Sequence, residues 1–345
     1  MRLLRQAALF FVLFLVSENS SPALQYFDVQ KVADGVYAAI GKPGVFANAA
    51  VIITEDGVIV VDTHLRPAWA RDLIQEIKKV TDKPVRYVIN THWHPDHVQG
   101  NKTYASTFGK EAEFISHHNT RDDIIGKAIP NIKQSLADTP IRITQLKLQL
   151  ESGKKLGGTA LSDEEKTQLS VQIKNSEEYL EELKTLEITV PNMTFDKSLI
   201  LYAADKEVRI LYFGEGHTRG DVVIHLPKEK VLLTGDLLTG GLPFMRDAIP
   251  TAWAATLANI GNLDFEQVIP GHGQVQKGKD RLNLVVNYLN DLVSAVKTQV
   301  DKGASLDETI KNVDLSKYEK DFENFKSGLT GPMGNITKTY EALKK

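Results

Sequence analysis

Short runs of apolar and β-branched residues, separated by turn-forming residues, dominate the sequence up to residue 90. Such runs predict buried strands at residues 36–40, 48–54, 58–62 and 85–90. Residues 55–57 (Glu-Asp-Gly) stand between two of these runs and are typical of a hairpin turn. From Pro67 to Val80 the apolar residues recur at the spacing of one helix face. Strands followed by a helix and a further strand predict a layered α/β domain.

The pattern changes between about residues 120 and 190, where apolar residues follow helical spacing among many charged ones. Ser162 and Glu165 form a capping-box signature at the start of one such helix. A glycine-rich stretch at residues 152–158 separates it from an earlier helix around residues 143–150. We therefore expect a helical-hairpin insertion at about 120–190, which is either a solvated projection or a lid over a site.

Strand-like runs resume after residue 195 and give way to helices towards the C-terminus. Strands are predicted at residues 199–203, 208–213, 222–225, 231–234 and 265–269, and helices at residues 253–260 and 282–300. The remaining sequence is polar and helical, with a second capping box at Ser305 and Glu308. The predicted organisation is a main domain over residues 24–275 and a C-terminal helical segment over residues 276–345.

The N-terminus and the composition indicate where the protein is located and which partners and metal ligands are excluded. Arg2 and Arg5 precede a short apolar run and a polar stretch that ends at Ala23, which is typical of a signal peptide over residues 1–23. The run is too short for a membrane anchor, so we expect an exported protein, periplasmic or secreted. The net charge of −3 and the absence of a basic block argue against a nucleic-acid partner. With no cysteine, any metal must be held by nitrogen and oxygen.

The highest density of possible metal-binding side chains lies just after the strand predicted at residues 85–90, in Thr91-His-Trp-His-Pro-Asp-His97. If the backbone stays extended past residue 90, His92 and His94 point to the same side, because side chains alternate along a strand. Pro95 suits the first turn of a following helix, which would carry Asp96 and His97. Three imidazoles and a carboxylate within six residues predict a metal site.

Three later turns carry further candidate ligands, and each turn lies directly beside a predicted strand. His217 stands in a glycine-rich turn, Asp236 in Thr-Gly-Asp-Leu and His272 in Pro-Gly-His-Gly. The order His-x-His-x-Asp-His, Gly-His-Thr, Gly-Asp and Pro-Gly-His-Gly resembles the ligand set of the metallo-β-lactamase-fold hydrolases. The resemblance runs from about residue 30 to about residue 275 and implies a four-layer αββα sandwich.

The resemblance also implies a role for each ligand. His92, His94 and His217 would hold one zinc, Asp96, His97 and His272 a second, and Asp236 would bridge the two. Two zinc ions sharing a water molecule would supply hydroxide at neutral pH, with Asp96 orienting it as a catalytic residue. Iron or manganese is the alternative to zinc, since the ligand set is also rich in oxygen.

Several functions remain open for such a site. An exported di-zinc hydrolase of a small molecule with a carbonyl-type bond (amide or lactam, ester or thioester) is the leading interpretation. A bridging aspartate, where many lactamases carry cysteine, favours a glyoxalase-type thioesterase or a lactonase as the alternative. An iron-dependent redox enzyme and a metal-binding protein without catalysis are further alternatives. Four more residues are expected to support or border the site, with ordinary structural roles as the alternative: Asp62, His64, His118 and Thr218.

Overall fold

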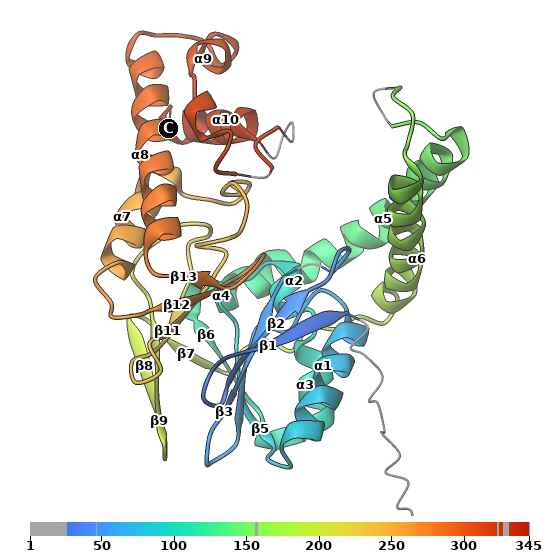
Figure 1. Ribbon diagram of the computed structural model, residues 1–345, viewed down its shortest axis with the longest axis vertical. Coiled ribbons are helices and arrows are strands. Elements are labelled where there is room, and N and C mark those ends of the chain that lie inside the picture. The colour runs from blue at the N-terminus through green and yellow to red at the C-terminus, as the bar shows by residue number, and fades with distance from the viewer. Residues whose placement is uncertain (1–25, 46, 156–157, 323, 327–330, 345) are drawn as a thin grey trace, which may run out of the picture.

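Two β-sheets face each other and helices cover their outer faces in the computed structural model (Figure 1), which describes residues 26–45, 47–155, 158–322, 324–326 and 331–344. The seven strands of the first sheet follow sequence order: β1 (Phe27–Ala33), β2 (Val36–Gly41), β3 (Ala49–Ile53), β4 (Val58–Val61), β5 (Val85–Ile89), β6 (Glu113–His117) and β7 (Met193–Phe195). The six strands of the second sheet are, from one edge to the other, β13 (Gln276–Lys277), β12 (Gln267–Pro270), β11 (Val231–Gly235), β10 (Val223–Leu226), β9 (Lys206–Leu211) and β8 (Ser198–Ala203).

The helices complete four layers. α1 (Pro67–Val80) and α3 (Asn101–Phe108) pack against the first sheet, and α7 (Pro250–Ile260) and α8 (Asp280–Asp301) against the second. Strand β4 shows why the layers form: Val58 and Val60 pack towards α1, whereas Ile59 and Val61 join the core between the sheets. Because side chains alternate along a strand, a fully apolar strand buries both faces. The predicted αββα sandwich is confirmed.

A long helical excursion separates β6 from β7. It contains α4 (His118–Asp123), a π-helical turn (Ile124–Ala128), α5 (Ile129–Ser152) and α6 (Asp163–Leu183), which begins at the predicted capping box. α5 and α6 lie side by side and project from the sandwich as an arm (Figure 1). α5 starts well before the predicted helix, because its first half buries too few side chains to produce an apolar periodicity.

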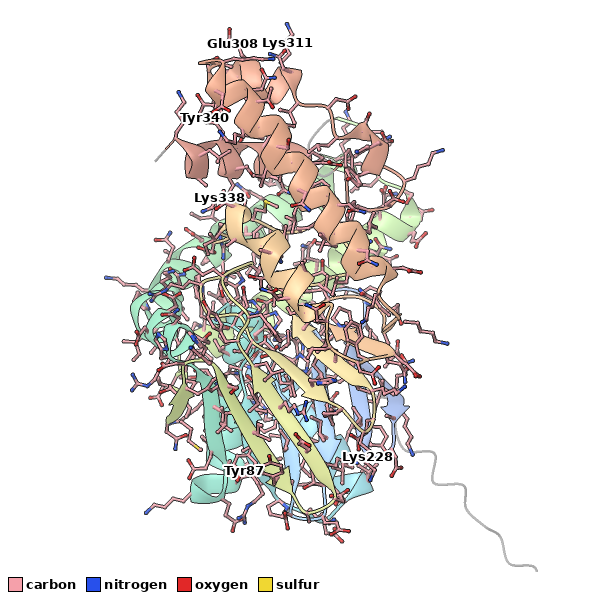
Figure 2. All side chains as sticks on the ribbon, turned by 90° about the vertical axis from the view of Figure 1, so that its left-hand side faces the viewer. Tyr87, Lys228, Glu308, Lys311, Lys338 and Tyr340 are labelled. Atoms are coloured by element: carbon pink, nitrogen blue, oxygen red, sulfur yellow. The ribbon has the colours of Figure 1, made fainter. Side chains whose placement is uncertain are left out.

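The C-terminal helices form a second projection beside the second sheet. α9 (Leu306–Asn312) and α10 (Pro332–Leu343) pack on α8, at the opposite end of the molecule from Tyr87 and Lys228 (Figure 2). Among the described residues, no helix combines the length and apolar character needed to cross a bilayer. The predicted signal peptide lies outside the described residues.

Strand direction determines where the functional side chains gather. Strands β4, β5 and β6 are parallel, and β11 is parallel to β12, while two antiparallel pairings make β9 parallel to β11. The carboxyl ends of parallel strands meet at one edge of a sheet, and ligands commonly bind there. The segments that follow β5, β9, β11 and β12 hold all seven predicted ligands.

Candidate metal centre

The local backbone presents the ligands of the first segment from a strand end. β5 ends at Ile89 and helix α2 (Pro95–Val98) begins at Pro95, with His94 extended as its N-cap (φ −61°, ψ 147°). The expected continuation of the strand past residue 90 is not observed, because the chain bends at residues 91–92; Pro95 then starts the helix. Asp96 and His97 therefore lie on the first turn of α2, as the sequence predicts.

One group of candidate ligands gathers His92, His94, His217 and Asp236, all buried. His94 Nδ1 lies 3.1 Å from His92 Nε2 and 2.9 Å from His217 Nε2. Asp236 Oδ2 lies 3.5 Å from His217 Nε2. Three nitrogens on one tetrahedral zinc ion would lie about 3.3 Å apart. The spacing of this group therefore fits a single small cation.

Hydrogen bonds on the outer ring nitrogens turn the inner ones towards that common point. His94 Nε2 donates to Asp247 Oδ2 (3.0 Å), and His217 Nδ1 donates to the Phe244 carbonyl (3.0 Å). His92 Nδ1 donates to the Thr91 hydroxyl (3.1 Å). With protons on the outer nitrogens, three inner lone pairs face one another without a shared proton. A metal ion satisfies such an arrangement, and neutral imidazole is the form that binds one.

A second group contains Asp96, His97 and His272. His272 Nε2 lies 3.4 Å from Asp96 Oδ2 and 3.2 Å from Asp236 Oδ2, and His97 Nε2 lies 3.4 Å from Asp236 Oδ1. Asp236 thus faces both groups. Among the described residues, His97 Nε2 and Asp236 Oδ1 are buried without a hydrogen-bond partner. Buried polar atoms are rarely left unpaired, so this pair also fits a metal ion.

The two groups differ electrostatically. Burial, reinforced by His97, holds the pKa of His92 well below its usual range, and burial together with His94 lowers the pKa of His217 to about 3. Burial would also lower the pKa of His97, but the carboxylates of Asp62 and Asp96 outweigh it and raise this pKa to about 9. Burial opposes ionisation of Asp236, yet His272 and His97 hold its pKa well below the usual value. His92 and His217 of the first group are therefore neutral imidazoles, whereas His97 of the second group is protonated beside carboxylates.

Two glycines allow the ligand segments to approach each other. A Cβ on Gly271 would lie 1.9 Å from Asp236 Oδ1, and a Cβ on Gly235 would lie 2.5 Å from Thr91 Oγ1. Gly235 also has a positive φ of 49°, which other residues adopt with strain. The Gly-Asp and Pro-Gly-His motifs therefore owe their glycines to packing at the site.

The four supporting residues lie in different environments. Asp62 Oδ2 accepts from His97 Nδ1 (2.8 Å) and from the Thr91 hydroxyl (2.7 Å). It therefore supports His97 directly and His92 through Thr91. Thr218 braces the His217 turn through hydrogen bonds to Asp221. His64, expected near the rim, is instead fully buried and stacked on Phe27, and burial lowers its pKa to about 3. His118 Nδ1 lies 2.9 Å from Asp196 Oδ1, and no contact of His118 with the candidate ligands is seen among the described residues.

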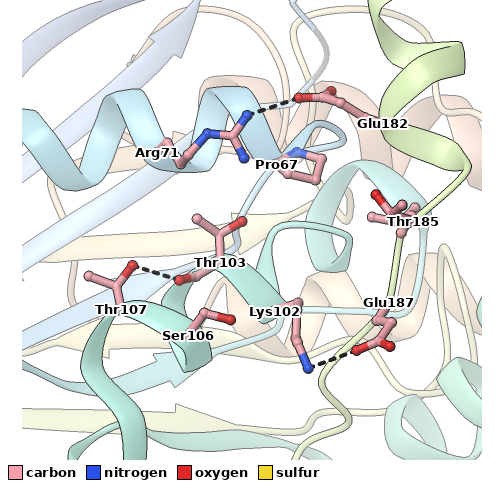
Figure 3. Close-up of a pocket in the computed structure, with 10 residues that line it drawn as sticks. Pro67, Arg71, Lys102, Thr103, Ser106, Thr107, Glu182, Thr185 and Glu187 are labelled. Carbon is pink, nitrogen blue, oxygen red and sulfur yellow. Dashed lines mark hydrogen bonds and ion pairs between the residues drawn. The ribbon is translucent and has the colours of Figure 1, made fainter.

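The open side of the centre lies at Asp96 and His272, whose side chains are 23% and 34% exposed. A groove of about 430 Å³ runs along α6 between α5, Trp69 and the 43–44 turn. Tyr179, which lines this groove, donates to the Gln99 amide oxygen (2.9 Å), two residues after His97. Another hollow of about 360 Å³ contains none of the candidate ligands and is crossed by the ion pairs Arg71–Glu182 and Lys102–Glu187 (Figure 3).

Sequence reasoning missed the partners of His94 and His217. Asp247 lies eleven residues after Asp236 in a segment without periodic pattern, and Phe244 contributes only its backbone carbonyl. No motif marks either position. Two arginines of these segments have carboxylate partners within the protein: Arg219 forms two hydrogen bonds to Asp123 (3.0 and 2.9 Å). Arg246 lies beside Asp247, with its Nε 3.0 Å from Asp247 Oδ2.

Comparison with known proteins agrees with this geometry. The profile of the family described as the Metallo-beta-lactamase superfamily matches residues 43–118 and 178–272, which include all seven candidate ligands. The chain belongs to this superfamily. The unmatched stretch between the two matched parts contains α5 and most of α6. The predicted family is therefore confirmed.

Two kinds of relative stand out in this superfamily. A linear primary-alkylsulfatase of a Pseudomonas species is 26% identical over 285 residues, which is 78% of this chain and 50% of the relative. The type 2 metallo-beta-lactamase of Bacillus cereus is 26% identical over 237 residues, covering 66% of this chain and 68% of that protein. The chain thus spans about half the length of the alkylsulfatase.

Solved structures give the same picture at the level of the fold. An inverting sec-alkylsulfatase from a Pseudomonas species matches with a TM-score of 0.65 and 18% identity, over 91% of this chain and 50% of that one. A metallo-beta-lactamase from Pontibacter korlensis matches with a TM-score of 0.52 and 17% identity, over 76% of this chain and 99% of that one. These likenesses establish the shared fold.

Proposed function

We propose that this protein is a metal-dependent hydrolase that holds two zinc ions at the described centre. The observation that carries the proposal is the convergence of five imidazoles and two carboxylates, with Asp236 facing both groups. Structural zinc sites normally close with four protein ligands, whereas catalytic ones keep an open position. Three ligands in each group, one carboxylate between them and an open side favour a catalytic site.

The residues of the centre would have the following roles in metal binding and hydrolysis. His92, His94 and His217 would hold one ion and Asp96, His97 and His272 the other, while Asp236 faces both groups. When bound, the ions would supply hydroxide at neutral pH and polarise the bond that is attacked. Asp96 Oδ2 lies on the open side, where it can orient a water molecule and accept its proton. Asp62 keeps His97 in the orientation that ligation requires.

Zinc is the metal we infer, because imidazole and carboxylate suit it and cysteine is absent. Iron and manganese accept similar ligands, and an iron-dependent redox enzyme would need such an ion. Metal analysis of purified protein separates the two possibilities. Two zinc ions per chain are expected, and iron as the main metal would contradict the proposal.

For the substrate, a small molecule with an amide or lactam, ester or thioester bond is the first candidate. A sulfate ester of an alkyl alcohol is the second, and one observation favours it. The alkylsulfatase matches cover 78% and 91% of this chain, whereas the lactamase matches cover 66% and 76%. The similarity to the alkylsulfatases therefore extends over a larger part of this chain than the similarity to the lactamases does.

A substrate panel tests the proposal directly. A cephalosporin, a thioester, a lactone and a linear alkyl sulfate are offered to the zinc-loaded protein and to an Asp236→Ala variant. Turnover of at least one substrate by the wild type, lost in the variant, is the expected result. Equal background rates for both proteins on every substrate would contradict the proposal and favour a binding protein.

We further propose an exported protein, periplasmic or secreted, that acts on a small molecule and has no nucleic-acid partner. The apolar run after Arg5 and the net charge of −3 support these proposals. Fractionation of cells that express the full chain, with an immunoblot of each fraction, tests the first. Protein that stays in the cytoplasm at full length would contradict export.

A further inference from the structure

We propose that the C-terminal helices help to build the metal centre, with Asn335 on α10 as a positioning residue for His94 and His217. The connection runs through residues 237–249, which link β11 to α7 and are here called the support loop. The inference rests on the proposed metal-binding role of these histidines.

The support loop contacts three of the candidate ligands. Asp247 accepts from His94, the Phe244 carbonyl accepts from His217, and Gly240 N donates to the His272 carbonyl (2.8 Å). The loop contains no helix or strand, so no regular hydrogen-bond ladder of its own holds these groups in place. Backbone bonds tie its two ends to the site, from Ile249 N to the Gly216 carbonyl (2.9 Å) and from Gly271 N to the Leu238 carbonyl (3.2 Å), so the middle of the loop depends on what packs on its other side.

The C-terminal helices supply that other side through hydrogen bonds to the loop backbone. The buried Asn335 Nδ2 donates to the Pro243 carbonyl (3.0 Å) and to Tyr288 Oη on α8 (2.9 Å). Lys338 Nζ donates to the Arg246 carbonyl (2.9 Å), next to Asp247, from the side of the C-terminal helices that faces the sandwich (Figure 2). Arg281 on α8 donates to the Gly240 and Gly241 carbonyls (2.7 and 2.6 Å).

Apolar packing follows the same two-sided pattern. Leu242, Met245 and Ala248 are buried in the core that also contains Tyr288 and Ile336. Phe244 and Asp247, two of the residues between them, contact the histidines instead. A displacement of α10 would therefore move the Pro243 and Arg246 carbonyls, and with them the adjacent residues Phe244 and Asp247. The outer partners of His94 and His217 depend on a residue about ninety positions further along the chain.

The test compares two variants of α10 in the full-length protein. Asn335→Ala removes the contacts with Pro243 and Tyr288. Tyr340→Phe removes one hydrogen bond of the same helix, from its hydroxyl to the Ala304 carbonyl (2.9 Å), which lies outside the support loop. Zinc affinity is measured by competition with a chelator, and the absorption spectrum of bound Co²⁺ reports the ligand geometry. Hydrogen exchange of residues 242–249 is followed in the metal-free protein.

We expect Asn335→Ala to weaken zinc binding roughly 10–100-fold, as loss of outer partners does elsewhere. It should also change the Co²⁺ spectrum and speed exchange of residues 242–249, whereas Tyr340→Phe leaves all three unchanged. If Asn335→Ala fails to fold, Lys338→Met is used instead. This change removes a solvent-exposed hydrogen bond to the Arg246 carbonyl and should still speed hydrogen exchange around Arg246 and Asp247. Wild-type affinity, spectrum and exchange in the variants that fold would overturn the proposal. Failure of the wild type to bind zinc would refute the proposed function instead, and the exchange comparison would still test the positioning role.

Discussion

Asp96 and Asp236 are the two carboxylates of the centre, and their surroundings assign them different tasks. Asp236 is buried between the two histidine groups, whereas Asp96 lies at the start of α2 on the open side. A buried carboxylate between two cations holds them together, while a partly exposed one can exchange protons with water. This difference makes Asp96 the residue to test for a part in turnover.

Replacing Asp96 with Ala should lower turnover at least about 100-fold, because a positioned proton acceptor typically contributes 10²–10⁴-fold. The side chain is partly exposed, so the melting temperature of the metal-free protein should change little. Steady-state kinetics on the best panel substrate, with zinc content measured in parallel, checks the prediction. Asp138→Ala, at an exposed position of α5 that bonds Gln134, is the control, and unchanged turnover in Asp96→Ala would refute the assigned role.

The charge difference between the two groups predicts proton release on metal binding. Below pH 9 the metal-free protein keeps a proton on His97, whose pKa is about 9, and zinc must displace it because a ligating imidazole is neutral. Affinity at the second group should therefore rise about tenfold per pH unit between pH 7 and about 9 for each proton released. His92 and His217, with lowered pKa values, are already neutral there and add no such dependence.

Calorimetric titration at pH 7 in buffers of different ionisation enthalpy measures the protons released. One zinc equivalent should bind with little release, and the other should release at least one proton. Zinc affinities that are the same at pH 6.5 and 8.5 for both equivalents would contradict the prediction.

At the residue scale, the side chains that gather at the centre were predictable from the sequence, but the outer partners of His94 and His217 were not. His92 and His94 were marked by the density of histidines after β5, not by a continued strand, because β5 ends at Ile89 and the chain bends at residues 91–92. His217, Asp236 and His272 were marked by their turns beside strands. The partners of His94 and His217 depend instead on the path of the support loop. A backbone carbonyl such as that of Phe244 has no sequence signature at all.

At the scale of single elements, helices with one buried stripe were the easiest to predict. α1 buries Trp69, Leu73 and Ile77, and its bounds agree with the sequence pattern. α3 was not predicted, since only Asn101 and Tyr104 are buried along its length. Periodicity reveals a helix only when burial selects one face.

The base of the α5–α6 arm depends on a buried charge. Arg66, with a side chain only 4% exposed, donates to Glu182 (2.8 Å) and Glu178 (3.0 Å) on α6. Arg66→Ala should lower the free energy of unfolding by about 2 kcal/mol, because it removes two charge-assisted hydrogen bonds of a buried side chain, while Glu182 keeps its ion pair with Arg71 (3.2 Å). Urea unfolding measures the loss. Lys184→Ala breaks the exposed pair with Glu181 on the same segment and should cost less than about 1 kcal/mol. Equal effects of the two changes would contradict the importance of the buried pair.

At the scale of the whole molecule, the ligands come from both sheets. His92 to His97 follow β5 of the first sheet, whereas His217, Asp236 and His272 belong to segments of the second. The four-layer architecture was predictable from the order of elements together with the resemblance of the motifs. How closely the C-terminal helices are joined to the centre was not, because those contacts depend on tertiary packing.

Removal of metal should therefore lower the stability of the entire sandwich. Zinc at about 100 times its dissociation constant adds about 2.7 kcal/mol and should raise the melting temperature by roughly 5 °C over the chelated protein. Differential scanning calorimetry with and without zinc measures the shift. Calcium, which prefers sites made only of oxygen, is the control and should give none. An equal shift with calcium would show that the stabilisation is unspecific.

The same distribution of ligands over two sheets has a kinetic consequence. A complete ligand set exists only after both sheets have docked, so an unfolded chain offers zinc at most the cluster around His92 to His97. An interaction that forms after the folding barrier slows unfolding and leaves the folding rate nearly unchanged. Bound zinc would then slow the separation of the two docked sheets, and the lifetime of the folded protein would increase with the zinc concentration of its compartment.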